Sequence, residues 1–254
     1  MWKRLDRVGG GRPPFVNGNA HVNPSIIGHR GAPSCAPENT PDSFVAAAAA
    51  GAEWVEFDVR RCRDATLIVH HDPCTRDGIP LVELDATALA ERGVWALDEV
   101  LARLPPGLGV DVEVKNLPGE PDYDDAQRIV GLLTDLLGSI VGQRPLMTSS
   151  FSPPTVQALA ASLVGVPTGL LHGPGMRVDG ASELALQIGA AVLCSHLDAQ
   201  HLDAETVSAV RDAGLAVMVW VVDDPAHAVR LADAGVDALC TNDPGRLVAA
   251  LRDH

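Results

Sequence analysis

Short runs of apolar residues recur along the chain, and most of them are followed by a segment with helical character. The apolar runs begin near residues 25, 54, 110, 145, 167, 191, 216 and 237. The helical stretches cover residues 41–50, 85–92, 96–103, 122–137, 153–162, 182–188, 203–213 and 225–234. Strands that alternate with helices at such short intervals predict βα units and a parallel sheet.

Eight such units predict an α/β protein of the (β/α)8 TIM-barrel class, whose active site lies at the C-terminal ends of the strands. No linker or low-complexity segment divides residues 24–254, so we expect one domain there, preceded by an N-terminal arm over residues 1–23. A doubly wound open sheet is the runner-up, but no glycine-rich nucleotide fingerprint follows the first strand.

The second predicted strand, residues 54–59, combines an apolar face with two carboxylates, Glu56 and Asp58, on the other face. The chain then returns over residues 66–69, too soon for a crossover helix. We therefore expect a hairpin and a short insertion, residues 59–105, after this strand. A turn centred on Asp64-Ala65 would place His71 opposite Asp58, within reach of a shared ligand.

Composition narrows the function classes. The 254 residues carry a formal charge of −14, which argues against nucleic acid or an anionic membrane as a bulk partner. The five cysteines are scattered and form no CxxC pair, which favours a reducing compartment. The N-terminus has no apolar run, so we expect neither a signal peptide nor a membrane span. We therefore expect a cytoplasmic protein. Oligomeric state is left open.

Polar residues collect at the predicted strand ends. They are His29 and Arg30, Glu56 and Asp58, His71, Glu113 and Lys115, and Trp220. Three carboxylates at one barrel mouth need a cation, and oxygen ligands predict Mg²⁺ or Ca²⁺, with Mn²⁺ as a third candidate. Two cationic side chains beside that cation suit a phosphate. Two histidines can serve as general acid and general base.

With these residues the sequence resembles the glycerophosphodiester phosphodiesterase family, within the PLC-like phosphodiesterases. The shared motifs occur in family order: His29-Arg30-Gly31, Pro37-Glu38-Asn39-Thr40, Glu56-Phe57-Asp58-Val59, His71-Asp72, Glu113-Val114-Lys115, Ser150-Phe151, Trp220, and Gly235-Val236-Asp237 with Thr241. The resemblance implies a metal-dependent TIM barrel that cleaves small-molecule glycerophosphodiesters to glycerol 3-phosphate and an alcohol.

The resemblance also implies roles for individual residues. Glu56, Asp58 and Glu113 would hold the cation, and His29 and His71 would form the acid–base pair. Arg30 and Lys115 would contact the phosphate. Apart from the resemblance, the strand-end position of Trp220 favours a wall of the substrate site, and Glu38, Asp72 and Asp111 are expected to support the site residues from behind.

The chain departs from the family pattern in three places. Only forty residues, 73 to 112, separate the His71-Asp72 motif from the Glu113 strand. Ala65 replaces the usual glycine of the hairpin turn, and Asp223 stands where asparagine is common. The short insertion leaves two alternatives: a lysophospholipase D or sphingomyelinase D-like lyase, and a non-catalytic TIM-barrel binding protein. The second predicts loss of catalytic residues, and all seven are present.

Overall fold

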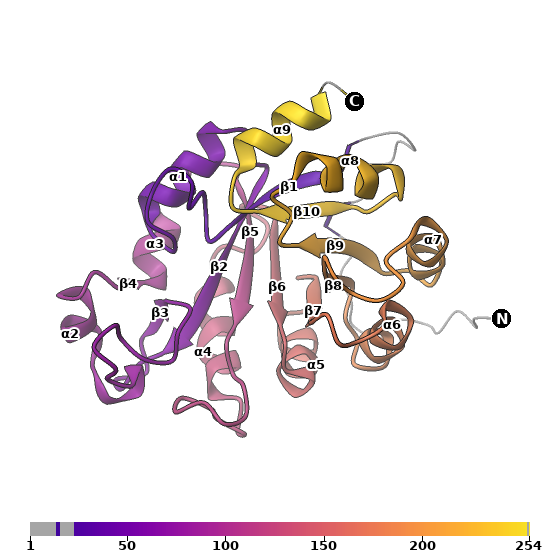
Figure 1. Ribbon diagram of the computed structural model, residues 1–254. Coiled ribbons are helices and arrows are strands. Elements are labelled where there is room, and N and C mark those ends of the chain that lie inside the picture. Colours follow the sequence, from indigo (N-terminus) through magenta and orange to yellow (C-terminus); the bar gives the residue numbers. More distant parts are fainter. Residues whose placement is uncertain (1–13, 16–22, 253) are drawn as a thin grey trace.

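Eight parallel strands close into a barrel in the computed structural model, which describes residues 14–15, 23–252 and 254 (Figure 1). The barrel closes because β1 pairs in parallel with both β10 and β2. The predicted TIM-barrel class is therefore confirmed, and each predicted barrel strand occurs. The strands are β1 (Ser25–His29), β2 (Trp54–Arg61), β5 (Gly109–Val114), β6 (Leu146–Ser150), β7 (Thr168–His172), β8 (Val192–His196), β9 (Ala216–Trp220) and β10 (Ala238–Thr241).

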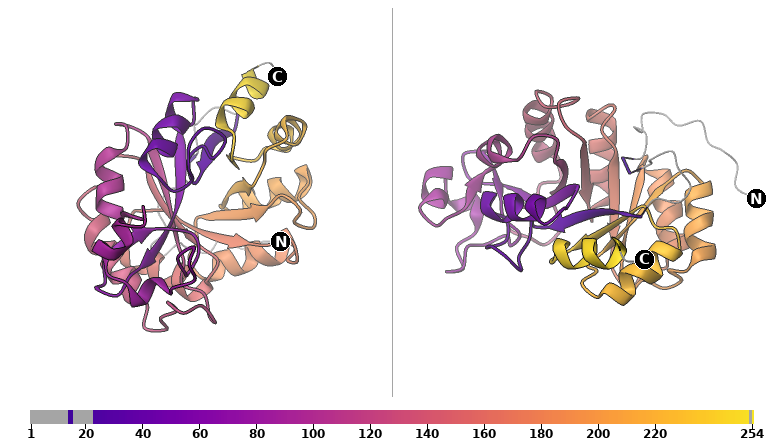
Figure 2. Two further views of the ribbon diagram at one scale, coloured as in Figure 1. Left: turned by 60° about the vertical axis from the view of Figure 1, so that its left-hand side comes forward. Right: turned by 90° about the horizontal axis from the view of Figure 1, so that it is seen from above.

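The helices lie outside the strands and cover the barrel (Figures 1 and 2). They are α1 (Pro41–Ala49), α4 (Arg128–Leu137), α5 (Pro153–Ser162), α6 (Val178–Gln187), α7 (Ala204–Asp212), α8 (Pro225–Asp233) and α9 (Pro244–Arg252). Local sequence sets several starts: Thr40 and Ser152 each cap a helix whose first residue is proline. Helix α9 was not predicted and completes the last βα unit. None of the helices in the described ranges combines the length and apolarity that a membrane crossing requires.

Helix α4 begins later than predicted, at Arg128 rather than near residue 122. The preceding aspartates use their side chains for other bonds. Asp124 accepts hydrogen bonds from the main-chain N–H groups of Ala126 and Arg128, and Asp122 is buried in an ion pair with Arg60. Gln127 is left-handed, with φ of 55°. Residues 115–127 therefore form the β5–α4 loop, which spacing alone did not reveal.

The barrel interior is filled by apolar side chains below the polar mouth. Trp54 packs across Gly109, where a Cβ atom would collide with the indole ring. Phe15 meets the edge of Trp54 with ring centroids 5.2 Å apart, and is buried. The remainder of the predicted arm, residues 1–13 and 16–22, lies outside the described residues. The other interior residues include Ile27, Met147, Leu171, Cys194, Met218 and Cys240.

The hairpin after β2 forms, but its predicted register is wrong by one residue. Strand β3 (Leu67–Val69) pairs Val69 with Val59, and the His70 N–H donates to the Asp58 carbonyl over 3.0 Å. The loop therefore has three residues, 63–65, closed by the bond from the Cys62 N–H to the Thr66 carbonyl. The extra turn residue shifts the pairing, so that His71 lies one position beyond Asp58.

Ala65 ends this turn in the left-handed region, with φ of 67°. We expect Ala65→Gly to raise the free energy of unfolding by about 0.5–1 kcal/mol. The left-handed conformation costs an L-residue about 1–2 kcal/mol, and the greater chain entropy of glycine offsets about 0.4–1 kcal/mol. Urea denaturation measures the change. Ala158→Gly within helix α5 is the control, expected to lower stability by about 1 kcal/mol; a lower stability of the Ala65 variant would contradict the prediction.

The insertion forms a small layer beside β2 (Figure 2). It contains a 3-10 turn (Leu81–Glu83), α2 (Ala86–Ala90), β4 (Trp95–Ala96) and α3 (Leu97–Arg103), and β4 extends the sheet by pairing with β3. Both helices predicted for this region occur. The layer has its own apolar contacts, which join Cys62 and Ile68 of the hairpin to Leu81 and Leu89.

Candidate active site

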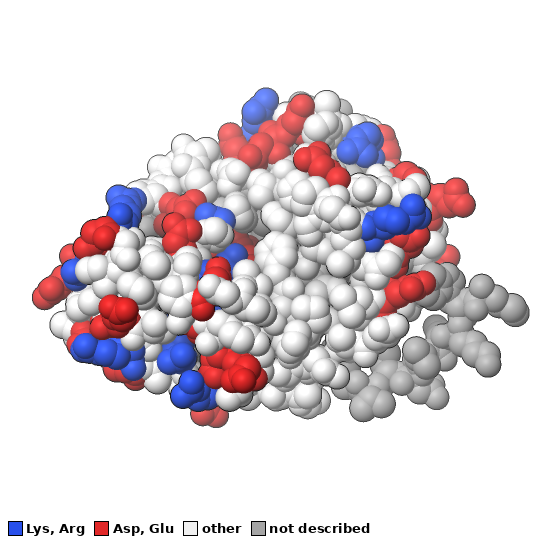
Figure 3. Space-filling model, turned by 60° about the horizontal axis from the view of Figure 1, so that its bottom comes forward, with Lys and Arg blue, Asp and Glu red and all other residues white. Residues whose placement is uncertain are grey.

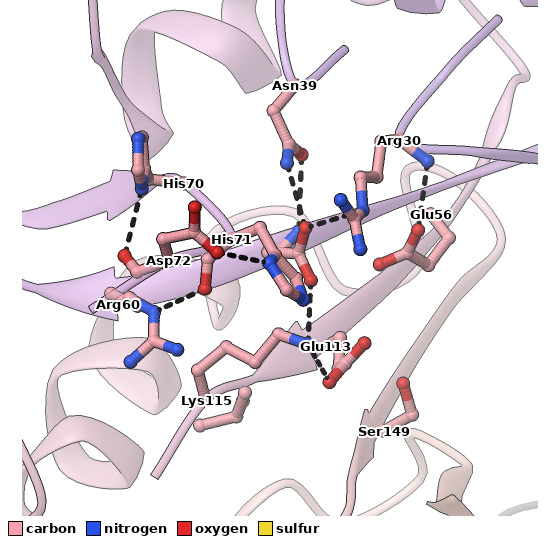
Figure 4. Close-up of polar contacts among 12 residues, drawn as sticks. Arg30, Asn39, Glu56, Arg60, His70, His71, Asp72, Glu113, Lys115 and Ser149 are labelled. Carbon is pink, nitrogen blue, oxygen red and sulfur yellow. Dashed lines mark hydrogen bonds and ion pairs between the residues drawn. The ribbon is translucent and has the colours of Figure 1, made fainter. Parts of the chain in front are cut away.

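Strand register brings the predicted acidic residues together. Side chains two positions apart on a strand share a face, so Glu56 and Asp58 point into the barrel mouth from β2. The parallel pairing of β2 with β5 sets Glu56 beside Asp111 and Asp58 beside Glu113. Figure 4 shows the resulting cluster at the C-terminal ends of these strands.

Glu56, Asp58 and Glu113 form a buried carboxylate triad, with one oxygen of each within 4.8 Å of the others. Burial, together with repulsion from Asp58 and Glu113, raises the pKa of Glu56 well above its usual value. Burial also raises the pKa of Glu113 to about 7, although Lys115 opposes the change. For Asp58 burial acts in the same direction, but Lys115 and Arg30 outweigh it and leave its pKa at about 2.

Two cations balance part of this negative charge. Lys115 Nζ lies 3.0 Å from Asp58 Oδ1 and 2.5 Å from Glu113 Oε1. Arg30 Nε lies 3.2 Å from Asp58 Oδ2, and its Nη1 donates to Glu38 Oε1 over 3.0 Å. Both cations therefore face the triad.

The Arg30 main chain also belongs to the cluster. Arg30 has a left-handed conformation with φ of 53°, unfavourable for a side chain of this size. That conformation lets its N–H donate to Glu56 Oε2 over 2.9 Å. Strained backbone of this kind gathers at functional sites.

The triad suits a hard divalent cation. Glu56 Oε1 is buried and has no hydrogen-bond partner among the described residues. Such an oxygen is costly unless something binds it. Behind the triad, Asp111 accepts a hydrogen bond from Ser149 Oγ over 2.9 Å, and burial raises its pKa to about 7. All the available donors are oxygens, the ligand type preferred by Mg²⁺ and Ca²⁺.

His29 is oriented by two residues to which the sequence reasoning assigned no role. Its Nδ1 lies 2.8 Å from Asn242 Oδ1, and Asn242 Nδ2 donates to Asp223 Oδ2 over 2.8 Å. Because the amide NH₂ is engaged by Asp223, the amide oxygen faces His29, and neutral His29 carries its proton on Nδ1. Burial lowers the pKa of His29. The only signal for Asn242 was its place directly after β10.

His71 faces the same cavity in spite of the register shift. Its Nδ1 lies 2.8 Å from Asp72 Oδ1, and the hydrogen bond from His71 lowers the pKa of Asp72. His70 points away and bonds the Asp72 carbonyl over 2.9 Å (Figure 4). The cavity has a volume of about 190 Å³ and is lined by His29, Arg30, Glu56, His71, Asp111, Glu113, Lys115, Ser149, Phe151, Leu171, Met218, Trp220 and Cys240.

Aromatic side chains form one wall of this cavity. Phe151 and Trp220 meet edge to face with centroids 5.4 Å apart, and His196 packs on Trp220 at 4.8 Å. The indole Nε1 donates to the Cys194 carbonyl over 3.0 Å, which fixes the ring. Phe151 was recognised as part of a motif but not as a site residue.

A second hollow adjoins the cavity on the insertion side. It has a volume of about 570 Å³, and His71 lines both spaces. Its other residues are mostly polar and include Glu38, Asp72, Arg76, Asp77 and Arg92. In Figure 3, charged side chains gather toward the margins of the face shown, around a broad uncharged central area.

A closed βα barrel with clustered carboxylates, two cations and two histidines at its mouth defines a TIM-barrel enzyme whose site suits a phosphate ester. The model of the glycerophosphoryl diester phosphodiesterase family matches residues 29–246, and the chain belongs to this family. Its activity class is accordingly that of a glycerophosphodiester phosphodiesterase.

Relatives of known name match nearly the full chain. A glycerophosphodiester phosphodiesterase of Caldanaerobacter subterraneus is 27% identical over 243 residues, which are 89% of this chain and 97% of that protein. The YhdW protein of Bacillus subtilis is 26% identical over 242 residues, 88% of this chain and 96% of that protein. A phosphodiesterase of Oleispira antarctica, solved with the product sn-glycerol-3-phosphate, has the same fold, with a TM-score of 0.74, 24% identity, and 91% and 97% of the two chains covered.

Proposed function

We propose that the chain hydrolyses glycerophosphodiesters to glycerol 3-phosphate and an alcohol with the help of a divalent cation. The observation that carries this proposal is the buried carboxylate triad with Arg30 and Lys115 beside it. Glu56, Asp58 and Glu113 would hold the cation, Mg²⁺ or Ca²⁺ before Mn²⁺. When bound, it would act as a Lewis acid that polarises the phosphoryl group. The product held by the Oleispira antarctica phosphodiesterase supports the choice of substrate.

His29 is the general base in this proposal. Its Nδ1–H is committed to Asn242, so the unprotonated Nε2 is free to accept a proton. Burial lowers its pKa, which keeps the ring neutral near pH 7. The proton comes from the nucleophile, which is either water or a neighbouring hydroxyl of the substrate; the latter gives a cyclic phosphate first.

His71 is the general acid. The ionised Asp72 accepts from Nδ1, so the proton on Nε2 is the one that can pass to the leaving alkoxide. Because His71 lines both the cavity and the adjoining hollow, the departing alcohol would lie in the hollow. Arg30 and Lys115 stabilise the charge that develops on the phosphoryl oxygens.

The charged side chains among the residues that line the hollow suit a small polar alcohol as the leaving group. A lysophospholipase D or sphingomyelinase D-like activity would release the same kind of alcohol but would retain an acyl chain on the other side of the phosphate. A panel from glycerophosphocholine to lysophosphatidylcholine of increasing chain length compares the two. Higher kcat/KM for the lysolipids would favour the alternative.

Turnover of glycerophosphocholine by the purified protein tests the proposal. We expect release of glycerol 3-phosphate, measured with a coupled dehydrogenase, to stop with excess chelator and to return with Mg²⁺ or Ca²⁺. Turnover that persists in chelator would contradict the role of the cation. No turnover of any diester in the panel would favour a binding barrel instead.

The proposed orientation of His29 predicts an effect at Asp223. Asp223→Ala frees the Asn242 amide to rotate, and we expect kcat to fall about tenfold to a hundredfold with little change in KM, the loss typical of outer partners of a functional histidine. Asp224→Ala is the control. Asp224 caps α8 through the Ala226 N–H, so its loss should cost about 1 kcal/mol of stability but leave kcat unchanged. Equal kcat values for the two variants would contradict the prediction.

A further inference from the structure

Arg60 is a buried cation that the mechanism above does not use. It follows Glu56 and Asp58 on the same face of β2, and its side chain is only 2% exposed. A guanidinium keeps its charge in proteins, so burial is tolerated only with close partners. Figure 4 shows the Arg60 side chain beside the segment that carries His71.

The guanidinium of Arg60 joins two segments that are distant in sequence. Nη1 lies 2.8 Å from Asp122 Oδ2 and 2.9 Å from Glu120 Oε2, both on the β5–α4 loop. Nε donates to the His71 carbonyl over 2.7 Å. Arg60 therefore ties the main chain of His71 to a loop that follows Lys115.

His71 has little other support. The β2–β3 ladder ends with the bond from the His70 N–H to Asp58, and within the described residues the only hydrogen bond to the His71 main chain comes from Arg60. The His71 side chain is 40% exposed and its partner Asp72 70% exposed. Exposed pairs contribute little and hold geometry loosely.

The loop that holds Arg60 is itself well anchored. Asn116 is buried and donates to the Asp124 carbonyl over 3.0 Å, while its Oδ1 accepts from the Asp124 N–H over 2.8 Å. Asp122, between them, is also buried. Because the loop is anchored, Glu120 and Asp122 hold the Arg60 guanidinium in one place. The bond from Arg60 Nε to the His71 carbonyl then restrains the main chain of His71.

We propose that Arg60 is a positioning residue that, clamped by Glu120 and Asp122, holds His71 in the orientation from which it protonates the leaving alcohol. Buried ion pairs are weak contributors to stability, since desolvation offsets most of their attraction. Alignment of an acid, by contrast, is sensitive to small displacements. The inference rests on the proposed role of His71.

Arg60→Lys tests the proposal with two substrates that differ in their need for an acid. Lysine keeps the charge but lacks the Nε–H donor and the planar fork. Cleavage of glycerophosphocholine releases choline as an alkoxide that needs a proton. Cleavage of a glycerol p-nitrophenyl phosphodiester releases p-nitrophenolate, which is already a stabilised anion. We expect kcat for glycerophosphocholine to fall at least about tenfold at unchanged KM. For the aryl ester we expect a loss of less than about threefold, since the acid contributes little there.

Two further variants accompany this test: one is a control, and the other replaces Arg60→Lys if that variant does not fold. Arg63→Lys alters an arginine of the same hairpin that is 59% exposed and paired with Asp85, and should leave both rates unchanged. If Arg60→Lys fails to fold, the double variant Arg60→Met with Asp122→Leu removes both buried charges together, which cores tolerate. It should show the same split between the substrates.

The outcomes distinguish failure of the positioning role from failure of the proposed function. If the unaltered protein cleaves neither substrate, the proposed function fails. If it cleaves both, and the Arg60 variants lower both rates equally or change neither, the positioning role is overturned while the function stands. A selective loss on glycerophosphocholine supports the positioning role.

Discussion

Replacing Glu56 by glutamine is expected to lower kcat/KM for glycerophosphocholine by about a thousandfold or more, because a catalytic cation contributes several kcal/mol. Glutamine preserves size but removes the charge, and Glu56 Oε1 is a buried oxygen with no hydrogen-bond partner among the described residues. Its other oxygen accepts the Arg30 N–H, so the amide also risks a donor-to-donor clash there. Steady-state kinetics at saturating Mg²⁺ or Ca²⁺ measures the loss, and calorimetric titration measures metal affinity in the same variant.

The matched control is Glu53→Gln. Glu53 precedes β2 at the opposite end of the barrel and is exposed, so both kinetics and metal affinity should match the unaltered protein. Equal metal affinity in the Glu56 and Glu53 variants would contradict the assignment of the triad. A folded Glu56 variant with normal turnover would do so independently.

Replacing the two histidines by alanine is expected to give different substrate profiles. His29→Ala should lower kcat at least about a hundredfold for both glycerophosphocholine and the aryl diester, because every substrate needs an activated nucleophile. His71→Ala should lower kcat at least about a hundredfold for glycerophosphocholine but less than about tenfold for the aryl diester, whose leaving group needs no proton. Initial rates with both esters give the comparison.

His227→Ala is the control for this pair, since His227 is exposed on helix α8 and lines neither the cavity nor the hollow. We expect its rates to stay within about threefold of the unaltered protein, as for substitutions away from the chemistry. The reverse pattern, with the aryl ester spared by His29→Ala, would exchange the roles of acid and base. Equal losses on both esters for both variants would contradict the assignment of His29 as the base and His71 as the acid.

Strand alternation explains how much of the site was predictable. A period of two places Glu56 with Asp58, and Asp111 with Glu113 and Lys115, on one face whatever the rest of the chain does. Eight βα units then require that these faces meet at one barrel mouth. The clustering of the triad with Lys115 followed from these two facts, and Arg30 was expected there from its place at the end of the first strand. The structure places all five together.

The errors came from places where a side chain competes with the regular backbone pattern. The hairpin register depended on one residue of turn length, and Ala65 takes a left-handed conformation that its identity does not suggest. Helix α4 starts at Arg128 because the two preceding aspartates bind other groups. Asp122 pairs with Arg60, and the Asp124 carboxylate accepts from main-chain N–H groups. Local spacing carries no information about such partners.

The sequence alone therefore determined the barrel, its strand order and the face on which each acidic residue lies, because these depend on local periodicity and on closure. Only the tertiary structure decided what supports the two histidines. Asn242 with Asp223 reaches His29 from the far end of the chain, and Arg60 reaches His71 across the hairpin. These contacts join residues whose separation in sequence is unrelated to their separation in space, and side-chain reach, not periodicity, brings them together.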